Sequence, residues 1–177
     1  MHQLKTAKFE KVSPNQFLEA FTNNYKEFSS RGAGDVIELI SKLYENIELP
    51  KRGTSGSAGY DFRSPVNIAI QPKESCTFVT GIRCCMSPEY FLMIVPRSSL
   101  GFKYKLTLDN TVGIIDSDYY NSDNEGHIMI KVTNNSNRTL YVNAGDKIAQ
   151  GIFIPYIKTD DDDVTEKRNG GIGSTGR

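Results

Sequence analysis

Two carboxylates and an aromatic ring, those of Asp116, Asp118 and Tyr119, stand close together in the chain. An ionised carboxylate can accept a proton from water, and a tyrosine ring offers a flat apolar face to a small ligand. The preceding residues 106–115 have a strand-like apolar pattern on both sides of an Asp-Asn turn, which predicts a hairpin. Such a hairpin would hold a small planar ligand beside a water-activating group. Taken alone, the segment also fits an ordinary solvated turn.

Arg97, Ser98 and Ser99 follow the most apolar stretch of the chain, residues 90–95. Arginine offers a planar fork of N–H donors that suits phosphate oxygens, and the two adjacent hydroxyls add to it. The alternative is a turn at the end of a strand, with the arginine in a surface ion pair.

The glycine-rich tail, residues 170–177, has a similar chemical character. Its glycines let backbone amides close on an anion, while Ser174, Thr175, Lys167 and Arg168 supply hydroxyls and charge. The tail is not a P-loop, because it lacks the Gly-Lys-Ser/Thr triplet and a following helix. The alternative is an unstructured terminus.

Two further polar residues are associated with apolar strands. Asp61 stands at the start of a strand after the glycine-rich loop 53–59. Gln150 lies inside an apolar strand, where an amide needs a hydrogen-bond partner. The simpler interpretation of Asp61 is a plain turn, and that of Gln150 is a core amide whose hydrogen bonds are satisfied.

The elements that must position these residues are strands. Short apolar runs fill the chain from Val36 onward, and Gly, Pro, Asn and Ser punctuate them. No helical period of useful length separates the runs, which predicts an all-β sandwich or barrel and argues against a parallel α/β sheet. At 177 residues the chain is long enough for one domain with a substantial core. The runs are VIELI (36–40), YDF (60–62), VNIAI (66–70), TFVTGI (77–82), YFLMIV (90–95), KLTL (105–108), VGII (112–115), HIMIKV (127–132), TLYVN (139–143) and KIAQGIFIPYI (147–157).

Both ends of the chain differ from this β-rich part. Ser13 and Pro14 predict the start of a helix with one apolar stripe. We therefore expect an N-terminal arm with a short amphipathic helix in residues 1–35, the β domain in 36–158, and an acidic linker with a flexible C-terminal arm in 159–177. The stripe consists of Phe17, Leu18, Phe21, Tyr25 and Phe28.

Charge and composition restrict the partners. The 21 basic residues balance the 21 acidic ones, so no general field favours nucleic acid or an anionic membrane. The sequence contains no apolar run long enough for a membrane span, and its N-terminus lacks the apolar segment of a signal peptide. Cys76, Cys84 and Cys85 lack metal-ligand spacing and are interpreted as reduced small hydrophobes, which favours a cytoplasmic protein.

Taken in order, the segments AGYDF, PRSSLGFK, DNTVGIIDSDY, GDKIAQ and GGIGSTG resemble the motifs of the trimeric dUTP pyrophosphatase (dUTPase) family. The resemblance covers residues 36–177, and the layout is similar to a longer bacterial and bacteriophage branch that also carries an N-terminal helix. It implies a jelly-roll subunit and a homotrimer with active sites at subunit interfaces. It also implies Mg²⁺-assisted hydrolysis of dUTP to dUMP and pyrophosphate, which would serve nucleotide-pool sanitation and dUMP supply.

The resemblance also implies roles for individual residues. Asp116 matches the carboxylate that orients and deprotonates the water attacking the α-phosphate. Arg97 and Ser98 match the residues that bind the α and β phosphates, and Gln150 matches the amide beside them. Asp61 matches a carboxylate that holds Mg²⁺ through water, an ion that keeps its waters and bridges phosphates.

Base selection is expected at the turn of the predicted hairpin. Backbone groups of residues 110–113 and the Asn110 side chain match the O4 acceptor and N3–H donor of uracil. Cytosine would leave buried groups unpaired, at about 1–3 kcal/mol for each group. A closed turn also leaves no room for the methyl group of thymine. Tyr119 matches the tyrosine whose ring packs on deoxyribose and excludes a 2′-OH.

The chain departs from the family pattern in three places. Ile172 stands where an aromatic residue is usual, so uracil stacking would become aliphatic cover. Lys167 occupies the usual arginine position of the tail and Arg168 follows it; either residue could bind the γ-phosphate, and Arg168 is favoured. Residues 120–124 form an extra loop that would border the site or a partner surface. The expected substrate-binding residues are Arg97, Ser98, Ser99, Asn110, Gly113, Tyr119, Gln150, Arg168, Ile172, Gly173, Ser174 and Thr175.

Two alternative functions are compatible with the sequence. The related dCTP deaminase chemistry occurs on the same fold, but the DNTVGIIDSDY segment resembles a uracil reader. The other alternative is a nucleotide-gated regulatory protein. Its N-terminal helix or the loop 120–124 would then contact a protein partner.

Overall fold

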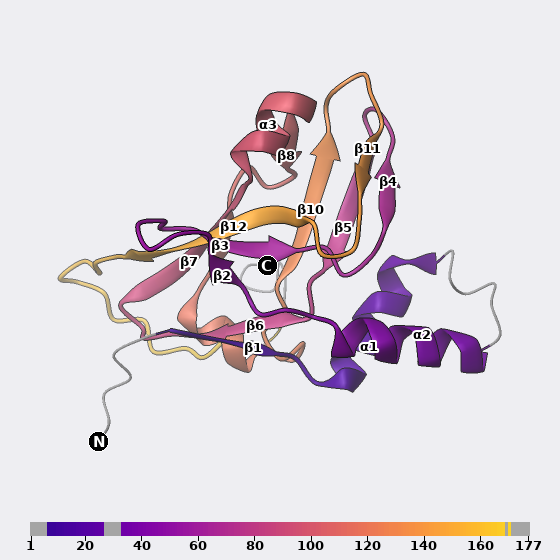
Figure 1. The fold of residues 1–177 in the computed structure, drawn as a ribbon. Coiled ribbons are helices and arrows are strands. Elements are labelled where there is room, and N and C mark those ends of the chain that lie inside the picture. The colour runs from indigo at the N-terminus through magenta and orange to yellow at the C-terminus, as the bar shows by residue number, and fades with distance from the viewer. Residues whose placement is uncertain (1–6, 27–32, 169, 171–177) are drawn as a thin grey trace.

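The computed structural model describes residues 7–26, 33–168 and 170 (Figure 1). Strands make up most of this part of the chain. They are β1 (Lys8–Lys11), β2 (Lys51–Arg52), β3 (Tyr60–Arg63), β4 (Ile68–Ile70), β5 (Ser75–Val79), β6 (Ile82–Cys85), β7 (Tyr90–Pro96), β8 (Leu106–Leu108), β9 (Gly113–Ile115), β10 (Met129–Asn134), β11 (Leu140–Val142) and β12 (Lys147–Pro155).

All the strand pairs of the described residues are antiparallel. The largest sheet has the order β2-β3-β12-β7-β9, and a second sheet has the order β5-β10-β8. The pairs β11-β4 and β1-β6 complete the β structure. The all-β fold predicted from the sequence is thereby confirmed.

One hydrophobic core joins the two larger sheets. Phe62 on β3 and Leu92 on β7 come from the first sheet, and Phe78 on β5 and Val132 on β10 come from the second. Burial alternates along β10, as expected for a strand with one face toward the core. The core therefore fixes which side chains of each strand point outward to the functional surface.

The N-terminal part contains two helices instead of the single helix expected. Helix α1 (Pro14–Asn24) begins after Ser13, whose hydroxyl accepts a hydrogen bond from the Gln16 amide at 3.1 Å. Phe17 and Phe21 are fully buried against the second helix and the edge of the sandwich. Phe28, the last residue of the predicted stripe, lies outside the described residues.

The run at residues 36–40 is not a strand, and this part of the sequence-based prediction is wrong. Helix α2 (Ala33–Glu45) contains it. Val36 and Ile40 are buried while Ile37 is 53% exposed, which is the four-residue spacing of a helix packed on one side. The four apolar residues of this run resemble a strand, but they belong to a longer helical pattern that continues through Leu43 and Tyr44, which pack against the same cluster.

The predicted hairpin is also wrong in its pairing. Strand β8 pairs with β10, whereas β9 pairs with β7, so the two strands leave the turn into different sheets. The turn itself is present: the Thr111 amide donates to the carbonyl oxygen of Leu108 at 3.0 Å, and Thr111 has a φ of 66°. Hydrophobic alternation identified both strands but carries no information about which partner each one pairs with.

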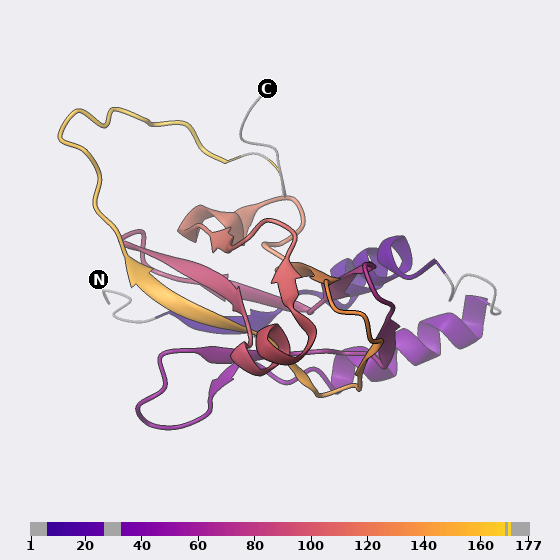
Figure 2. The ribbon, with the colours of Figure 1, turned by 90° about the horizontal axis from the view of Figure 1, so that it is seen from above.

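Two short helices occupy positions next to the candidate site residues. Helix α3 (Ser98–Tyr104) starts one residue after β7, where the sequence left a strand-end turn as the alternative interpretation. The 3₁₀ helix η2 (Ser117–Asn121) follows β9 and contains Tyr119. The segment after β12 runs back across the molecule toward the side on which η2 lies (Figure 2).

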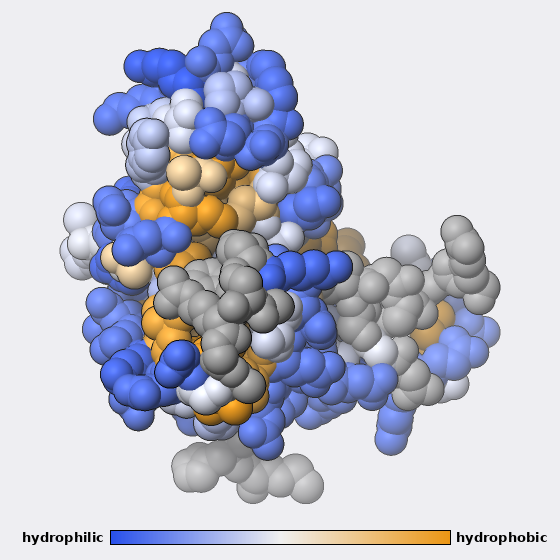
Figure 3. All heavy atoms as spheres, turned by 90° about the vertical axis from the view of Figure 1, so that its right-hand side faces the viewer, coloured by the Kyte–Doolittle hydropathy of each residue, from blue (hydrophilic) through white to orange (hydrophobic). Residues whose placement is uncertain are grey.

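The two helices α1 and α2 lie together at one end of the sandwich (Figures 1 and 2). From that side, hydrophobic residues reach the surface in a band between hydrophilic regions (Figure 3). A single chain therefore leaves part of its apolar surface uncovered. Within the described ranges, no helix has the length and apolar character needed to cross a bilayer.

Candidate active site

A cleft of about 640 Å³ collects five of the residues predicted to bind and hydrolyse a nucleotide. Its floor is apolar and comes from β7, β8 and β10, with Ile94, Leu108 and Ile130 among the lining residues. An apolar floor with a few polar groups at the edge is typical of a site for a small ligand. The predicted residues in the lining are Asn110, Gly113, Asp116, Tyr119 and Arg168.

Asp116 is held at the edge of this cleft by the C-terminal segment. Its Oδ2 atom accepts a hydrogen bond from Nη2 of Arg168 at 2.6 Å, and Oδ1 of Asp118 accepts one from Nε of Arg168 at 2.9 Å. The Arg168 guanidinium also lies 5.5 Å from the ring centroid of Tyr119. One arginine thus brings both carboxylates and the aromatic ring of the predicted site into a single cluster.

Tyr119 is fixed so that its ring, and not its hydroxyl, is available to the cleft. The hydroxyl donates to the backbone oxygen of His127 at 2.9 Å and accepts from Nδ2 of Asn124 at 2.7 Å. Burial raises the pKa of the phenol, although Asn124 and Arg168 oppose that effect. A neutral tyrosine with both hydrogen-bonding functions occupied is suited to packing, not to proton transfer.

The turn at residues 109–112 forms one end of the cleft. Its first residue, Asp109, forms an ion pair with Lys131 at 3.2 Å, and the Asp109 amide donates to the Lys131 carbonyl at 3.1 Å. These contacts anchor the turn to β10. A Cβ added to Gly113 would lie 3.0 Å from Cβ of Ile94, so the close approach of β9 to β7 depends on this glycine.

A second group of predicted residues lies on three neighbouring strands. Gln150 on β12 stands opposite Asp61 on β3, and the preceding residue of β12, Ala149, stands opposite Pro96 at the end of β7. Arg97 follows Pro96 directly. The register of β3, β12 and β7 therefore assembles Asp61, Gln150 and Arg97 from distant parts of the chain.

Asp61 is a buried carboxylate with three polar partners. Its Oδ2 atom lies 2.7 Å from Nζ of Lys147, its Oδ1 atom accepts from Nε2 of Gln150 at 3.2 Å, and Nε of Arg97 lies 3.7 Å away. Burial by itself would raise the pKa of Asp61, but Lys147, Gln150 and Arg97 together hold it below its ordinary value. Asp61 therefore remains charged and orients two cations and an amide.

The cations held in this way border a second cavity of about 330 Å³. Arg63, Arg97 and Lys147 line it together with Asp146 and Tyr141. Three positive side chains around one cavity are a suitable environment for phosphate oxygens. Ser98 and Ser99 are exposed at the start of α3, next to Arg97.

Among the residues that the structure describes, the two cavities share no lining residue. Asp116, Tyr119 and the turn belong to the first, and Arg97 and Lys147 to the second. A single chain therefore presents two half-sites, one with an apolar floor beside a tyrosine ring and one bordered by three cations.

The residues present do not form a metal cage. Among the side chains of residues 7–26, 33–168 and 170, no group of three His, Cys, Asp or Glu could hold a metal ion. Asp61 is already engaged by Lys147 and Gln150. These residues do not suit a Mg²⁺ ion held by protein ligands. They suit a Mg²⁺ ion whose ligands are mainly phosphate oxygens and water.

Several site residues were not foreseen from the sequence. Lys131, Arg63 and Lys147 are charged residues on strands, where an exposed ion pair is the ordinary interpretation. Only their three-dimensional neighbours distinguish them. The predicted tail residues Ile172, Gly173, Ser174 and Thr175 lie outside the described part of the chain.

The fold and the half-sites define an antiparallel β-sandwich protein with a site for a phosphorylated planar ligand. Residues 45–176 match the sequence profile of the dUTPase family. The chain belongs to this family, and the prediction of a dUTP diphosphatase is confirmed.

Curated relatives extend the match over most of the chain. The deoxyuridine 5′-triphosphate nucleotidohydrolase of Lactococcus lactis is 40% identical over 144 residues, which cover 78% of this chain and 95% of the relative. The enzyme of the same name from Escherichia coli is 36% identical over 151 residues, covering 81% of this chain and 97% of the relative.

Solved structures agree with this assignment. The dUTPase of Streptococcus mutans is 38% identical with a TM-score of 0.59, covering 66% of this chain and 91% of the other. The dUTPase from phage phi11 of Staphylococcus aureus has a TM-score of 0.62 and covers 92% of this chain and 97% of the other. Its identity is 19%, so it supports the fold alone.

Proposed function

We propose that this protein hydrolyses dUTP to dUMP and pyrophosphate by attack of a water molecule on the α-phosphate. The observation that carries the proposal is the cluster of Asp116, Tyr119 and Arg168 beside the turn at residues 109–112, all in one cleft. This cluster joins a proton acceptor, a flat ring and a cation at the mouth of an apolar pocket.

In the proposed mechanism, Asp116 orients the water and accepts its proton. A carboxylate is a weak base, so most of the rate enhancement must come from positioning the water and neutralising the triphosphate. Arg97 contributes to that neutralisation with Ser98 and Ser99, and Gln150 lies beside them. Mg²⁺, when bound with the triphosphate, would supply further charge neutralisation; the assignment of Asp61 as its water-mediated holder stays a prediction.

Base selection is assigned to the turn. Backbone groups of residues 110–113 and the Asn110 side chain would pair with uracil, and the ring of Tyr119 would pack on the deoxyribose. The apolar floor of the cleft supports this placement. A ribose 2′-OH would meet the ring of Tyr119, whose hydroxyl is already occupied by His127 and Asn124.

A complete site is proposed to form in a homotrimer. The separation of the half-sites supports this, because one nucleotide needs both of them. Exposed apolar side chains occur at each: Ile114, which is 50% exposed, lines the first cavity, and Tyr141, which is 73% exposed, lines the second. Phe102 on α3 is 91% exposed. Burying such residues between subunits would bring the cavities of neighbouring chains together.

The decisive experiment measures pyrophosphate release with Mg²⁺ from dUTP, dCTP, dTTP and UTP side by side. Turnover confined to dUTP would support the proposal. Ammonia release from dCTP would instead identify a deaminase. Equal turnover of dUTP and UTP would contradict the role given to Tyr119.

A second experiment tests the C-terminal arm. Lys167 is exposed, and neither Lys167 nor Arg168 belongs to the two hydrophobic core clusters, so a chain that ends before Lys167 loses little core packing. We expect this truncated protein to remain folded and trimeric, with most of its activity lost, because Arg168 and the glycine-rich residues are removed. Full turnover by the truncated protein would exclude the arm from the mechanism.

A further inference from the structure

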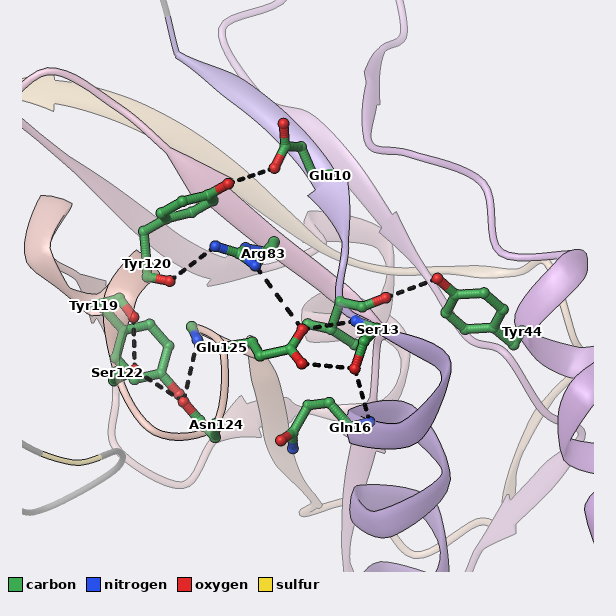
Figure 4. Close-up of polar contacts among 12 residues, drawn as sticks. Glu10, Ser13, Gln16, Tyr44, Arg83, Tyr119, Tyr120, Ser122, Asn124 and Glu125 are labelled. Carbon is green, nitrogen blue, oxygen red and sulfur yellow. Dashed lines mark hydrogen bonds and ion pairs between the residues drawn. The ribbon is translucent and has the colours of Figure 1, made fainter.

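The extra loop at residues 120–124 connects the candidate site to the N-terminal segment. It follows Tyr119 directly and is followed by Glu125, whose carboxylate contacts the start of α1; with Glu125 it forms the connection 120–125. Figure 4 shows the loop residues Tyr120 and Glu125 on one side, the N-terminal residues Glu10 and Ser13 on the other, and Arg83 between them.

The first connection runs through Tyr120. Its hydroxyl donates to Oε2 of Glu10 on β1 at 2.6 Å. The guanidinium of Arg83 lies 3.5 Å from the centroid of the Tyr120 ring, and Nη2 of Arg83 donates to the Tyr120 backbone oxygen at 3.1 Å. Both the ring and the backbone of the residue after Tyr119 are therefore fixed.

The second connection runs through Glu125. Its two carboxylate oxygens accept hydrogen bonds from the Ser13 amide at 2.7 Å and the Ser13 hydroxyl at 2.6 Å. Burial alone would raise the pKa of Glu125, but the two bonds from Ser13 and the charge of Arg83 lower it. The same Ser13 hydroxyl caps α1 by accepting from Gln16. The Ser13 hydroxyl therefore contacts both the start of α1 and Glu125 at the end of the connection.

Inside the loop, the contacts converge on Tyr119. Asn124 donates to the Tyr119 hydroxyl at 2.7 Å, and the Ser122 hydroxyl donates to the Tyr119 backbone oxygen at 2.6 Å. The loop therefore encloses the tyrosine that lines the cleft, while its outer side is attached to β1 and α1.

We propose that the N-terminal segment, residues 8–16, positions Tyr119 for sugar selection through the loop 120–125, with Ser13, Glu125, Tyr120 and Glu10 as positioning residues. This inference rests on the proposed function, because it concerns discrimination between dUTP and UTP. It assigns the segment that precedes the family match a role in substrate selectivity. No step of the hydrolysis itself passes through these residues.

The test compares full-length variants by two measurements: the melting temperature, and the ratio of kcat/KM for dUTP to kcat/KM for UTP. Ser13→Ala removes the hydroxyl that bonds Glu125, and we expect the ratio to fall roughly tenfold because small displacements in a site have large kinetic effects. Ser13→Thr keeps the hydroxyl and should restore the ratio. Tyr120→Phe removes only the bond to Glu10 and should lower the ratio about threefold.

Tyr44→Phe is the matched control. The Tyr44 hydroxyl donates to the backbone oxygen of Val12 at 2.7 Å, which is on the same segment and not on the loop. We expect this variant to melt earlier and keep the selectivity of the unmodified protein. An equal fall in selectivity for Tyr44→Phe would show general loosening and overturn the proposal.

The result also separates this inference from the proposed function. If the unmodified protein does not prefer dUTP, the proposed function fails. If it does prefer dUTP and Ser13→Ala keeps the same ratio at a lower melting temperature, only the positioning role fails. In that case the contacts between the loop and the N-terminal segment would be purely structural.

Discussion

Nη2 of Arg168 lies 2.6 Å from Oδ2 of Asp116, which joins the C-terminal segment to the proposed base within one chain. The same guanidinium reaches Asp118, and only 14% of the Arg168 side chain is exposed. The donors that contact these carboxylates are also the donors that a phosphate group would use. Nucleotide binding and the Arg168–Asp116 contact are therefore expected to compete.

Replacing Arg168 tests whether its main partner during turnover is the nucleotide. We expect Arg168→Ala to lower kcat/KM for dUTP by roughly a hundredfold, because a charged donor to the triphosphate is lost. Lys167→Ala is the matched control, since Lys167 is exposed, and its effect should be small. Pyrophosphate release measures both. A rise in kcat for Arg168→Ala would instead show that Arg168 restrains Asp116.

Asp116→Asn should separate binding from chemistry. The amide keeps the size of the side chain but cannot accept the proton of water, so dUTP should bind while pyrophosphate release falls by at least roughly a hundredfold. Asp118→Asn is the control, because Asp118 shares the contact with Arg168 without the assigned base role. Calorimetry with a non-hydrolysable dUTP analogue measures binding. Equal losses in both variants would remove the distinction between the two carboxylates.

Because His127 is buried, we expect the free energy of unfolding to fall when the protein is acidified. Burial lowers its pKa from the ordinary 6.5 to about 4, although Glu125 opposes this effect. Between these values the unfolded chain binds more protons than the folded one, so the free energy of unfolding falls as pH drops from 6.5 to 4. At 1.36 kcal/mol for each pH unit, the difference approaches about 3 kcal/mol.

Denaturant titrations from pH 7 to pH 4 measure this contribution. In the His127→Gln variant, whose side chain does not titrate, the slope that His127 contributes between pH 6.5 and 4 should be absent. The variant should also be less stable at pH 7, since Nε2 of His127 accepts the Gly81 amide at 2.8 Å. The same pH slope in both proteins would contradict the assignment.

Gly126 closes the loop behind Tyr119. It has a φ of 69°, and a Cβ at this position would lie 2.7 Å from the Tyr119 backbone oxygen and from Cα of Tyr120. We expect Gly126→Ala to lower the free energy of unfolding by about 2–4 kcal/mol. Gly101→Ala, in α3 with no atom within 4 Å of the added Cβ, should be neutral or slightly stabilising. Chemical denaturation of both variants measures the difference.

Part of the candidate site was predicted correctly from the sequence. Asp116, Tyr119 and Arg168 were all predicted, and the structure brings them into one cleft with Asn110 and Gly113. Lys131 and Lys147 were missed, because a charged residue on a strand has no distinctive pattern until its neighbours are known. Helix α2 was missed because its first apolar residues are β-branched and read as a strand.

The sequence by itself determined the all-β character, the order of the motifs and the residue types able to handle a phosphorylated base. These properties depend on local periodicity and on side-chain chemistry, which a linear string contains. Only the tertiary structure decided that β8 and β9 enter different sheets and that Asp61 faces Lys147. It also decided that Glu125 meets Ser13, residues separated by 112 positions. Such pairings depend on which distant segments pack together. That packing is determined by burial of the hydrophobic core, to which segments from the whole chain contribute.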